Sequence, residues 1–205
     1  MKTQKELMEE ASKEYGIGGS ADYFRFEKSG TYRVRILTLC YPMASYFFGK
    51  GIKPKIAYSE MEKPKDENGE EIQPTLKFVG YLIDRTDGKI KLAELTYSVM
   101  KALTALQKDE DYTFADFPMP YDIKVTFDKD AAPNDKYKVV PAPKQEPLTE
   151  QEAADLEEKM KNITPEKYVE KRKDKQREED NATKSYDGQA TDYPEEEITP
   201  EDVPF

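Results

Sequence analysis

The stretch that most restricts the fold of this chain is residues 76–96. Two strand-like runs, LKFVGYLID (76–84) and KIKLAELT (89–96), flank the turn Arg85-Thr86-Asp87-Gly88. An Asp-Gly pair supplies the positive φ that a tight turn requires, so the segment predicts an antiparallel β-hairpin. Gly80, in the middle of the first run, indicates a kink or a close approach of another backbone, as where a bent strand closes a barrel.

Other strands are predicted on both sides of the hairpin. Apolar and polar residues alternate over the first half of 31–39 and over 121–128, and KYKVVP (136–141) is a short closing strand ended by its proline. In 31–39, Tyr32, Val34 and Ile36 share a face, which places Arg33 and Arg35 together on the opposite, outer face. A helix capped by Thr96 or Ser98 and ending at Gln107 is expected from its stripe of Val99, Leu103 and Leu106.

The order of these elements is strand, long insertion, hairpin, helix, strand and strand. This is the connectivity of an OB-fold, a five-stranded Greek-key barrel that binds oligonucleotides on its second and third strands and on two of its loops. We therefore expect a mainly β domain at 21–143, with one capping helix. The insertion 41–58 is expected to be the first of the two binding loops, and 129–135 the second.

The insertion YPMASYFFGKGIKPKIAY (41–58) combines aromatic and basic residues without an acidic one. Single-stranded nucleic acid suits such a mixture, because cations hold the backbone while aromatic rings stack on unpaired bases. About half of these rings are expected to belong to the core instead. The predicted DNA-contact residues are Arg33, Arg35, Tyr46, Phe48, Lys50, Lys53, Lys55, Tyr58, Lys77, Tyr81, Lys89 and Lys91.

Charge is divided unevenly along the 205 residues. Residues 1–143 carry 22 Lys and Arg against 23 Asp and Glu, whereas 144–205 carry 10 against 19. The net charge of −10 therefore belongs mainly to the C-terminal third. The chain has no His and one Cys, which excludes an internal disulfide, a Cys/His zinc site and a His-based triad. No metal or other cofactor is expected, and with no apolar run of membrane-spanning length we expect a soluble protein with no membrane partner.

Charged helices are predicted on both sides of the β domain. Residues 2–15 have helical spacing and, with the glycines that follow, form an N-terminal arm at 1–20, which either packs on its own barrel or touches a neighbouring protomer. After Pro143, Thr149 and Glu152 form a capping box, and Pro165 starts a second helix. These helices make up an extension at 144–180. Its run KRKDKQREED (171–180) has no apolar face and is interpreted as a solvated helix or as disorder; alternatively its basic residues add phosphate contacts or hold the acidic tail.

The last segment, 181–205, is expected to be a disordered acidic tail. Like charges and three prolines prevent it from folding alone, yet it ends in the apolar sequence Val-Pro-Phe. A terminal ring beside its own carboxylate fits a partner with an apolar pocket and a basic rim. The alternative is a tail that only adds solubility. The predicted partner-binding residues are Glu195, Glu196, Glu197, Glu201, Asp202, Val203, Pro204 and Phe205.

Two parts of the chain resemble known single-stranded DNA-binding proteins. The acidic run closed by Pro-Phe resembles their C-terminal tails, and RVRILT, FVGYLIDRTDGKIKLAELTYSVMKAL and PYDIKVTF resemble phage-encoded OB-fold members. The resemblance implies a protein that coats single-stranded DNA during phage replication, recombination or repair in the cytoplasm of a bacterial host. Its tail would recruit proteins such as a polymerase, helicase or recombinase and compete with DNA for the binding groove, and self-association along the DNA stays open. Some phage members bind a structural zinc, which this chain lacks the ligands to hold.

A protein-binding adaptor and a metal-dependent nuclease are the alternative functions. A non-catalytic adaptor could use the same OB-like scaffold to bind proteins only, since a fold does not fix a function. A metal-dependent nuclease would need paired acidic residues, but the candidates Asp84, Asp87, Glu94 and 109–111 lie in turns or at a helix end without that spacing. We therefore expect a binding protein and no enzyme activity.

Overall fold

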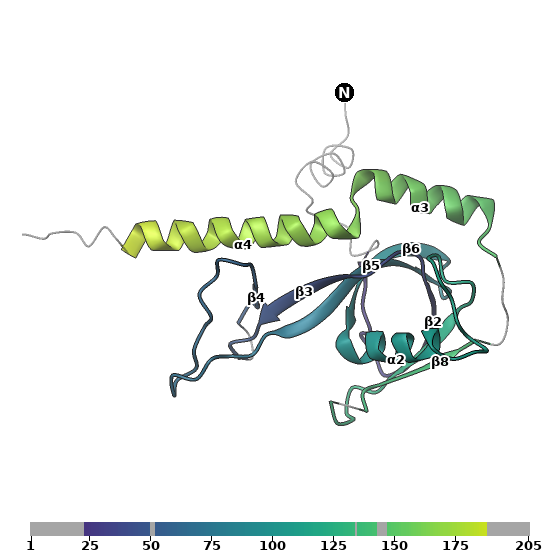
Figure 1. The fold of residues 1–205 in the computed structure, drawn as a ribbon, viewed down its shortest axis with the longest axis horizontal. Coiled ribbons are helices and arrows are strands. Elements are labelled where there is room, and N and C mark those ends of the chain that lie inside the picture. The colour runs from purple at the N-terminus through teal and green to yellow at the C-terminus, as the bar shows by residue number, and fades with distance from the viewer. Residues whose placement is uncertain (1–22, 50–51, 134, 143–146, 188–205) are drawn as a thin grey trace, which may run out of the picture.

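The computed structural model describes residues 23–49, 52–133, 135–142 and 147–187, and shows one β-sheet with three helices packed against it (Figure 1). The predicted N-terminal arm (1–20) and residues 188–205 of the predicted tail lie outside the described residues. Within the described residues, the helices are α2 (Tyr97–Gln107), α3 (Glu150–Asn162) and α4 (Pro165–Asp187). The fold is mainly β, as predicted.

The predicted hairpin is confirmed and is the centre of the sheet. Strand β5 (Thr75–Asp84) pairs antiparallel with β6 (Lys89–Thr96), in a register that runs from Lys77 opposite Thr96 to Asp84 opposite Lys89. Gly80 is the expected close approach, because a Cβ there would lie 2.6 Å from the Sγ atom of Cys40. Thr38 and Cys40 therefore pack closely against β5 at this point.

Strand β5 is long enough to pair with two successive strands of the chain. Its C-terminal part pairs with β2 (Gly30–Ile36), and its N-terminal part pairs with β3 (Tyr41–Tyr46). β3 in turn pairs with the two-residue strand β4 (Lys55–Ile56). The prediction that 41–58 is a loop is therefore wrong: most of it is a β3–β4 hairpin, called the arm below, that extends the sheet beyond the rest of the fold (Figure 1).

The sheet is open, so the predicted closed barrel is wrong for the described strands. Its order is β1-β6-β5-β2-β7-β8, where β1 is Tyr23–Phe24, β7 is Ile123–Phe127 and β8 is Tyr137–Pro141. The strands at the two ends of this order, β1 and β8, do not pair with each other, and β1 pairs with β6 at Leu92 and Ala93. Aromatic rings pack near both terminal strands instead, with Phe26 5.0 Å from Phe24 and 5.4 Å from Tyr137 between ring centroids.

Apolar side chains fill both faces of the sheet. One core cluster joins the sheet to α2 and includes Val34, Leu82, Val99, Leu103 and Ile123. The buried alternation of β7 and the stripe of α2 follow the sequence pattern here. The helix prediction is therefore confirmed at its core-facing residues.

A second core cluster lies on the other face of β5 and β6, and the C-terminal helices cover it. It includes Val79, Ile83 and Ile90 of the hairpin and Val169 of α4, which is 3% exposed. The Thr149 capping box at the start of α3 is confirmed. The structure supports a helix at 171–180, one of the two interpretations, and contradicts disorder. This helix is not solvated on all sides, since α4 runs along the sheet and the arm, and it continues to Asp187, past the predicted boundary at 180.

Candidate nucleic-acid interface

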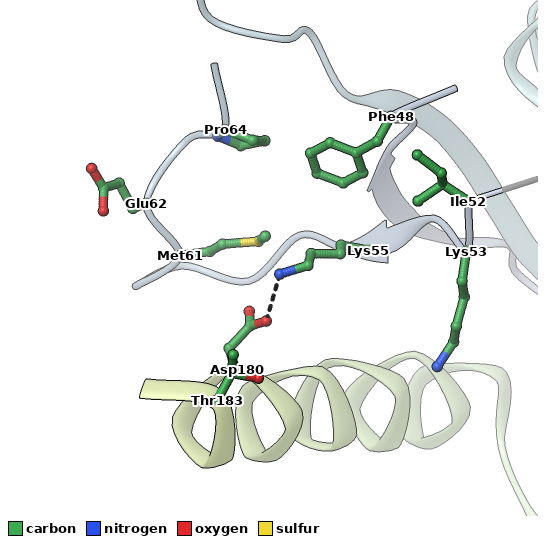
Figure 2. A pocket seen from close by; sticks show the side chains of 9 residues that line it. All are labelled: Phe48, Ile52, Lys53, Lys55, Met61, Glu62, Pro64, Asp180 and Thr183. Atoms are coloured by element: carbon green, nitrogen blue, oxygen red, sulfur yellow. Dashed lines mark hydrogen bonds and ion pairs between the residues drawn. The ribbon is translucent and has the colours of Figure 1, made fainter. Parts of the chain in front are cut away.

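A hollow of about 380 Å³ lies between the arm, the segment that follows it and α4 (Figure 2). We call it the arm groove. The turn between β3 and β4 contributes two of its apolar side chains, and the chain after β4 folds back to contribute two more. The lining residues are Phe48, Ile52, Lys53, Lys55, Met61, Glu62, Pro64, Asp180 and Thr183.

The lining of the arm groove combines apolar side chains with two cations. Phe48, Ile52, Met61 and Pro64 gather around the hollow, whereas Glu62 points away from it (Figure 2). Phe48 is half-buried, so part of its ring is free to meet a ligand. An exposed ring face with lysines beside it suits an unpaired base whose phosphates are held by the cations.

Helix α4 supplies the anions that face these cations. The Nζ atom of Lys55 lies 2.9 Å from Oδ1 of Asp180, and that of Lys53 lies 3.2 Å from Oε1 of Glu179. The hydroxyl of Tyr58 donates to the other oxygen of Asp180 at 3.1 Å. Burial opposes ionisation of Asp180, but the hydrogen bonds from Lys55 and Tyr58 hold the pKa of this carboxyl below its ordinary value.

The preceding turn of α4 adds contacts to the arm and to the residues that follow it. The side-chain oxygen of Gln176 accepts a hydrogen bond from the backbone N–H of Ile56 at 3.2 Å. Arg177 lies over the ring of Tyr58, 5.2 Å from its centroid, and pairs with Glu60 at 3.0 Å. Basic residues of α4 were predicted to contact phosphates or to hold the acidic tail, which stays a prediction; the contacts described here for Arg177 are with residues that follow the arm.

Four of the predicted DNA-contact residues are therefore brought together by the structure. Phe48, Lys53 and Lys55 line the arm groove, and Tyr58 shares Asp180 with Lys55. Lys50 lies outside the described residues, as do all the predicted partner-binding residues from Glu195 to Phe205.

The prediction that Arg33 and Arg35 both stand exposed on the outer face is wrong for Arg35. Arg35 is 1% exposed, and its Nε donates to Oδ1 of Asp122 at 2.8 Å. Arg33 donates to the other oxygen of Asp122 at 2.7 Å, and its side chain is 41% exposed. Arg85 donates to the same carboxylate and also to Glu152 of α3. The two arginines share a face, as predicted, but both donate there to the buried carboxylate of Asp122, which directly precedes β7.

Two predicted stacking residues are also inaccessible. Tyr46 and Tyr81 are 7% and 5% exposed. The hydroxyl of Tyr81 donates to the backbone carbonyl of Ile163 at 3.0 Å, because the junction of α3 and α4 covers this part of β5. Both rings therefore belong to the core in this structure.

The remaining predicted cations, Lys77, Lys89 and Lys91, belong to the β5–β6 hairpin. Two of them form ion pairs within the hairpin, and Lys77 lies at the opposite end from the other two. Lys77 pairs with Glu94 at 2.9 Å, near one end of the hairpin. At the other end Lys89 is exposed, and Lys91 pairs with Asp84 and Asp87 at 2.9 and 2.7 Å. Partial burial opposes protonation of Lys91, but these two carboxylates raise its pKa. The hairpin lysines thus do not extend the arm groove as one continuous track.

Sequence reasoning missed part of the site. Ile52, Met61 and Pro64 carry no signal that distinguishes them from other apolar loop residues. Glu179 and Asp180 lie more than a hundred residues from the lysines that they contact, so no local pattern connects them.

The described residues contain no group of three or more His, Cys, Asp or Glu side chains arranged to hold a metal ion. No described helix has the length and apolar character needed to cross a membrane.

Comparison with known proteins gives one relative. Over 75 residues, 37% of this chain and 27% of the relative, the chain is 25% identical to a protein of Escherichia phage T5 named "Probable ssDNA-binding protein". The match thus spans about a quarter of that protein's length. No protein-family model and no solved structure matches the chain.

Proposed function

We propose that this protein binds single-stranded DNA without sequence preference, and that the arm groove is a principal contact. The observation that carries the proposal is the arm groove, which a half-buried Phe48 lines together with other apolar side chains and with Lys53 and Lys55. The name of the phage T5 relative supports the same ligand. Stacking of one base on a protein ring contributes about 1–3 kcal/mol, so one such ring affects affinity measurably.

Each residue of the groove has a proposed part. Phe48 stacks on a base, with Met61 and Pro64 excluding water around it. Lys53 and Lys55 hold the flanking phosphates, and Tyr58 is a second ring beside them. Arg35, Tyr46 and Tyr81 are left out of the interface because they are buried.

The connectivity of the sheet supports a further proposal, that the fold is an opened OB-fold. β2 and β3 together take the place of its first strand, β5 and β6 form the central hairpin, and β7 and β8 follow α2. The wider role proposed is non-catalytic coating of DNA during phage replication, recombination or repair in the host cytoplasm. The acidic segment that ends at Phe205 is proposed to recruit partner proteins.

Fluorescence anisotropy with labelled oligo-dT tests the central proposal. The Phe48→Ala variant should bind about 5- to 100-fold more weakly than the unaltered protein. Tyr97→Ala is the matched control, since Tyr97 is 57% exposed on α2 and lies outside the groove, and it should bind normally. Thermal melting of each variant separates lost affinity from lost folding.

Salt and competitor experiments complete this test. The logarithm of the binding constant should fall with the logarithm of salt concentration, with a slope of about −0.7 for each phosphate neutralised. Duplex DNA should compete less well than oligo-dT. A protein that retains no oligo-dT even at low salt would refute the proposal and favour the protein-binding adaptor.

A further inference from the structure

The two halves of α4 are held to the rest of the molecule by different kinds of contact. In the N-terminal half, Pro165 is buried and Val169 packs into the core cluster that covers β5 and β6. In the C-terminal half, from 173 to 183, Gln176 is the one described residue that is buried, and its contact is a hydrogen bond to Ile56. The N-terminal half is therefore fixed by apolar packing and the C-terminal half by polar contacts.

The polar contacts of α4 use the cations proposed to bind phosphate. Glu179 and Asp180 lie within 3.2 Å of the Nζ atoms of Lys53 and Lys55, and Asp180 also holds the hydroxyl of Tyr58. A phosphate placed on these lysines would stand beside two carboxylates of the same sign. Such like charges repel at short range, so DNA and α4 compete for one pair of cations.

From this arrangement we infer that single-stranded DNA displaces the C-terminal half of α4 from the arm, while the N-terminal half stays packed on the sheet. The inference rests on the proposed function and deepens it, because it makes release of α4 a step of DNA binding. Phosphates replace carboxylates on Lys53 and Lys55, and the released segment begins near Gln176. Tyr58 loses its contact with Asp180 in the same step and becomes available to a base.

The exchange is feasible because the described side chains of the C-terminal half of α4 include no buried apolar one. Lys53 is 72% exposed and Lys55 47% exposed even with α4 in place, and ion pairs as exposed as these contribute little stability. The Ile56 N–H loses its partner Gln176 but gains access to water. Val169 keeps its core contacts, so it marks where the release of α4 ends.

Zero-length cross-linking with a carbodiimide tests the release directly, since the reagent joins amines to carboxylates that are already in contact. Without DNA, mass spectrometry should find Lys53 joined to Glu179 and Lys55 joined to Asp180. Saturating oligo-dT with a 5′-hydroxyl end should lower the yield of both links at least several-fold. The pair formed by Lys63 and Glu71, 2.8 Å apart and outside the groove lining, is the internal control and should cross-link equally in both samples.

The outcomes of this experiment separate the inference from the proposed function. If anisotropy shows binding but the two cross-links persist at full yield, DNA binds with α4 in place and the inference is wrong. If no binding is seen, the proposed function itself fails. Protein that has been cross-linked first should bind oligo-dT weakly, and normal binding by that material would also overturn the inference.

Charge-neutral variants give an independent measure. Glu179→Gln combined with Asp180→Asn should tighten binding at low salt by about three- to tenfold, because two weak competing ion pairs are lost. The gain should shrink as salt rises, since salt screens those pairs in the unaltered protein. The control Glu158→Gln with Glu178→Gln removes the same net charge from exposed helical positions and should change affinity much less. Equal gains in both variants would mean that only net charge matters, which would contradict release of α4.

Discussion

Replacing Asp122 by Asn should destabilise the protein more than any exposed change, because this carboxylate is the shared acceptor of three guanidinium groups. Asp122 is 0% exposed. Of its three partners, Arg35 is 1% exposed, so its guanidinium group has no access to solvent that could replace the lost carboxylate. Asn keeps the shape of the side chain but removes its charge. Removing one partner of a buried ion pair costs about 3–5 kcal/mol, since the other charge stays buried without compensation.

The cost of Asp122→Asn can be measured by urea unfolding and by a thermal melt. A loss of 3–5 kcal/mol should lower the melting temperature of a domain of this size by about 6–20 °C. Asp130→Asn is a suitable control, because Asp130 is exposed and its change should cost within about 0.5 kcal/mol. Adding Arg35→Met to Asp122→Asn should recover part of the loss. A cost below about 1 kcal/mol for Asp122→Asn would refute the view that Arg35 depends on a buried counter-charge.

Three further predictions concern the close approach at β5, the acidic contact of α4 and the core. Gly80→Ala should lower the free energy of unfolding by about 1–3 kcal/mol, because the new Cβ would lie 2.6 Å from the Cys40 Sγ. Adding Cys40→Ala should restore most of the lost free energy, and urea unfolding measures both changes. Lys55→Met should raise the pKa of the Asp180 carboxyl toward its ordinary value, which an NMR titration would measure; an unchanged pKa would contradict the ion pair. Because the pKa of Asp180 is depressed in the folded protein, the stability that this contact contributes is present above about pH 4 and is lost as the pH falls below it. Tyr46→Ala should cost about 3–5 kcal/mol of stability because the ring is 7% exposed, and a loss of DNA affinity with normal stability would show that this ring is a binding platform instead.

Features set by neighbouring residues were predicted well from the sequence. The hairpin follows from its Asp-Gly turn and its two apolar runs, and the Thr149 capping box depends on residues three positions apart. The cluster of Phe48, Lys53, Lys55 and Tyr58 was also found, because these residues are close along the chain. Such patterns depend on local spacing, which a single sequence displays directly.

Features that depend on distant residues were not predicted. Arg35 follows the strand alternation as expected, but its partner Asp122 is eighty-seven positions away and converts an outer face into a buried one. The strand β1 is only two residues long, and nothing at 23–24 indicates that it pairs with β6. Among the described side chains of α4, the buried apolar ones are Pro165 and Val169, both in its N-terminal half, so the rest of its sequence looks solvated although polar side chains fix it to the arm.

The open sheet has a consequence for how copies of the protein could meet. Among the described strands, those with a free side are β1 and β4, each two residues long, and β8, which ends in a proline. Such short borders offer an incoming chain very few unpaired backbone groups. If the proposed coating of DNA is correct, neighbouring molecules on one strand would contact each other through side chains, and they could separate without breaking backbone hydrogen bonds between strands.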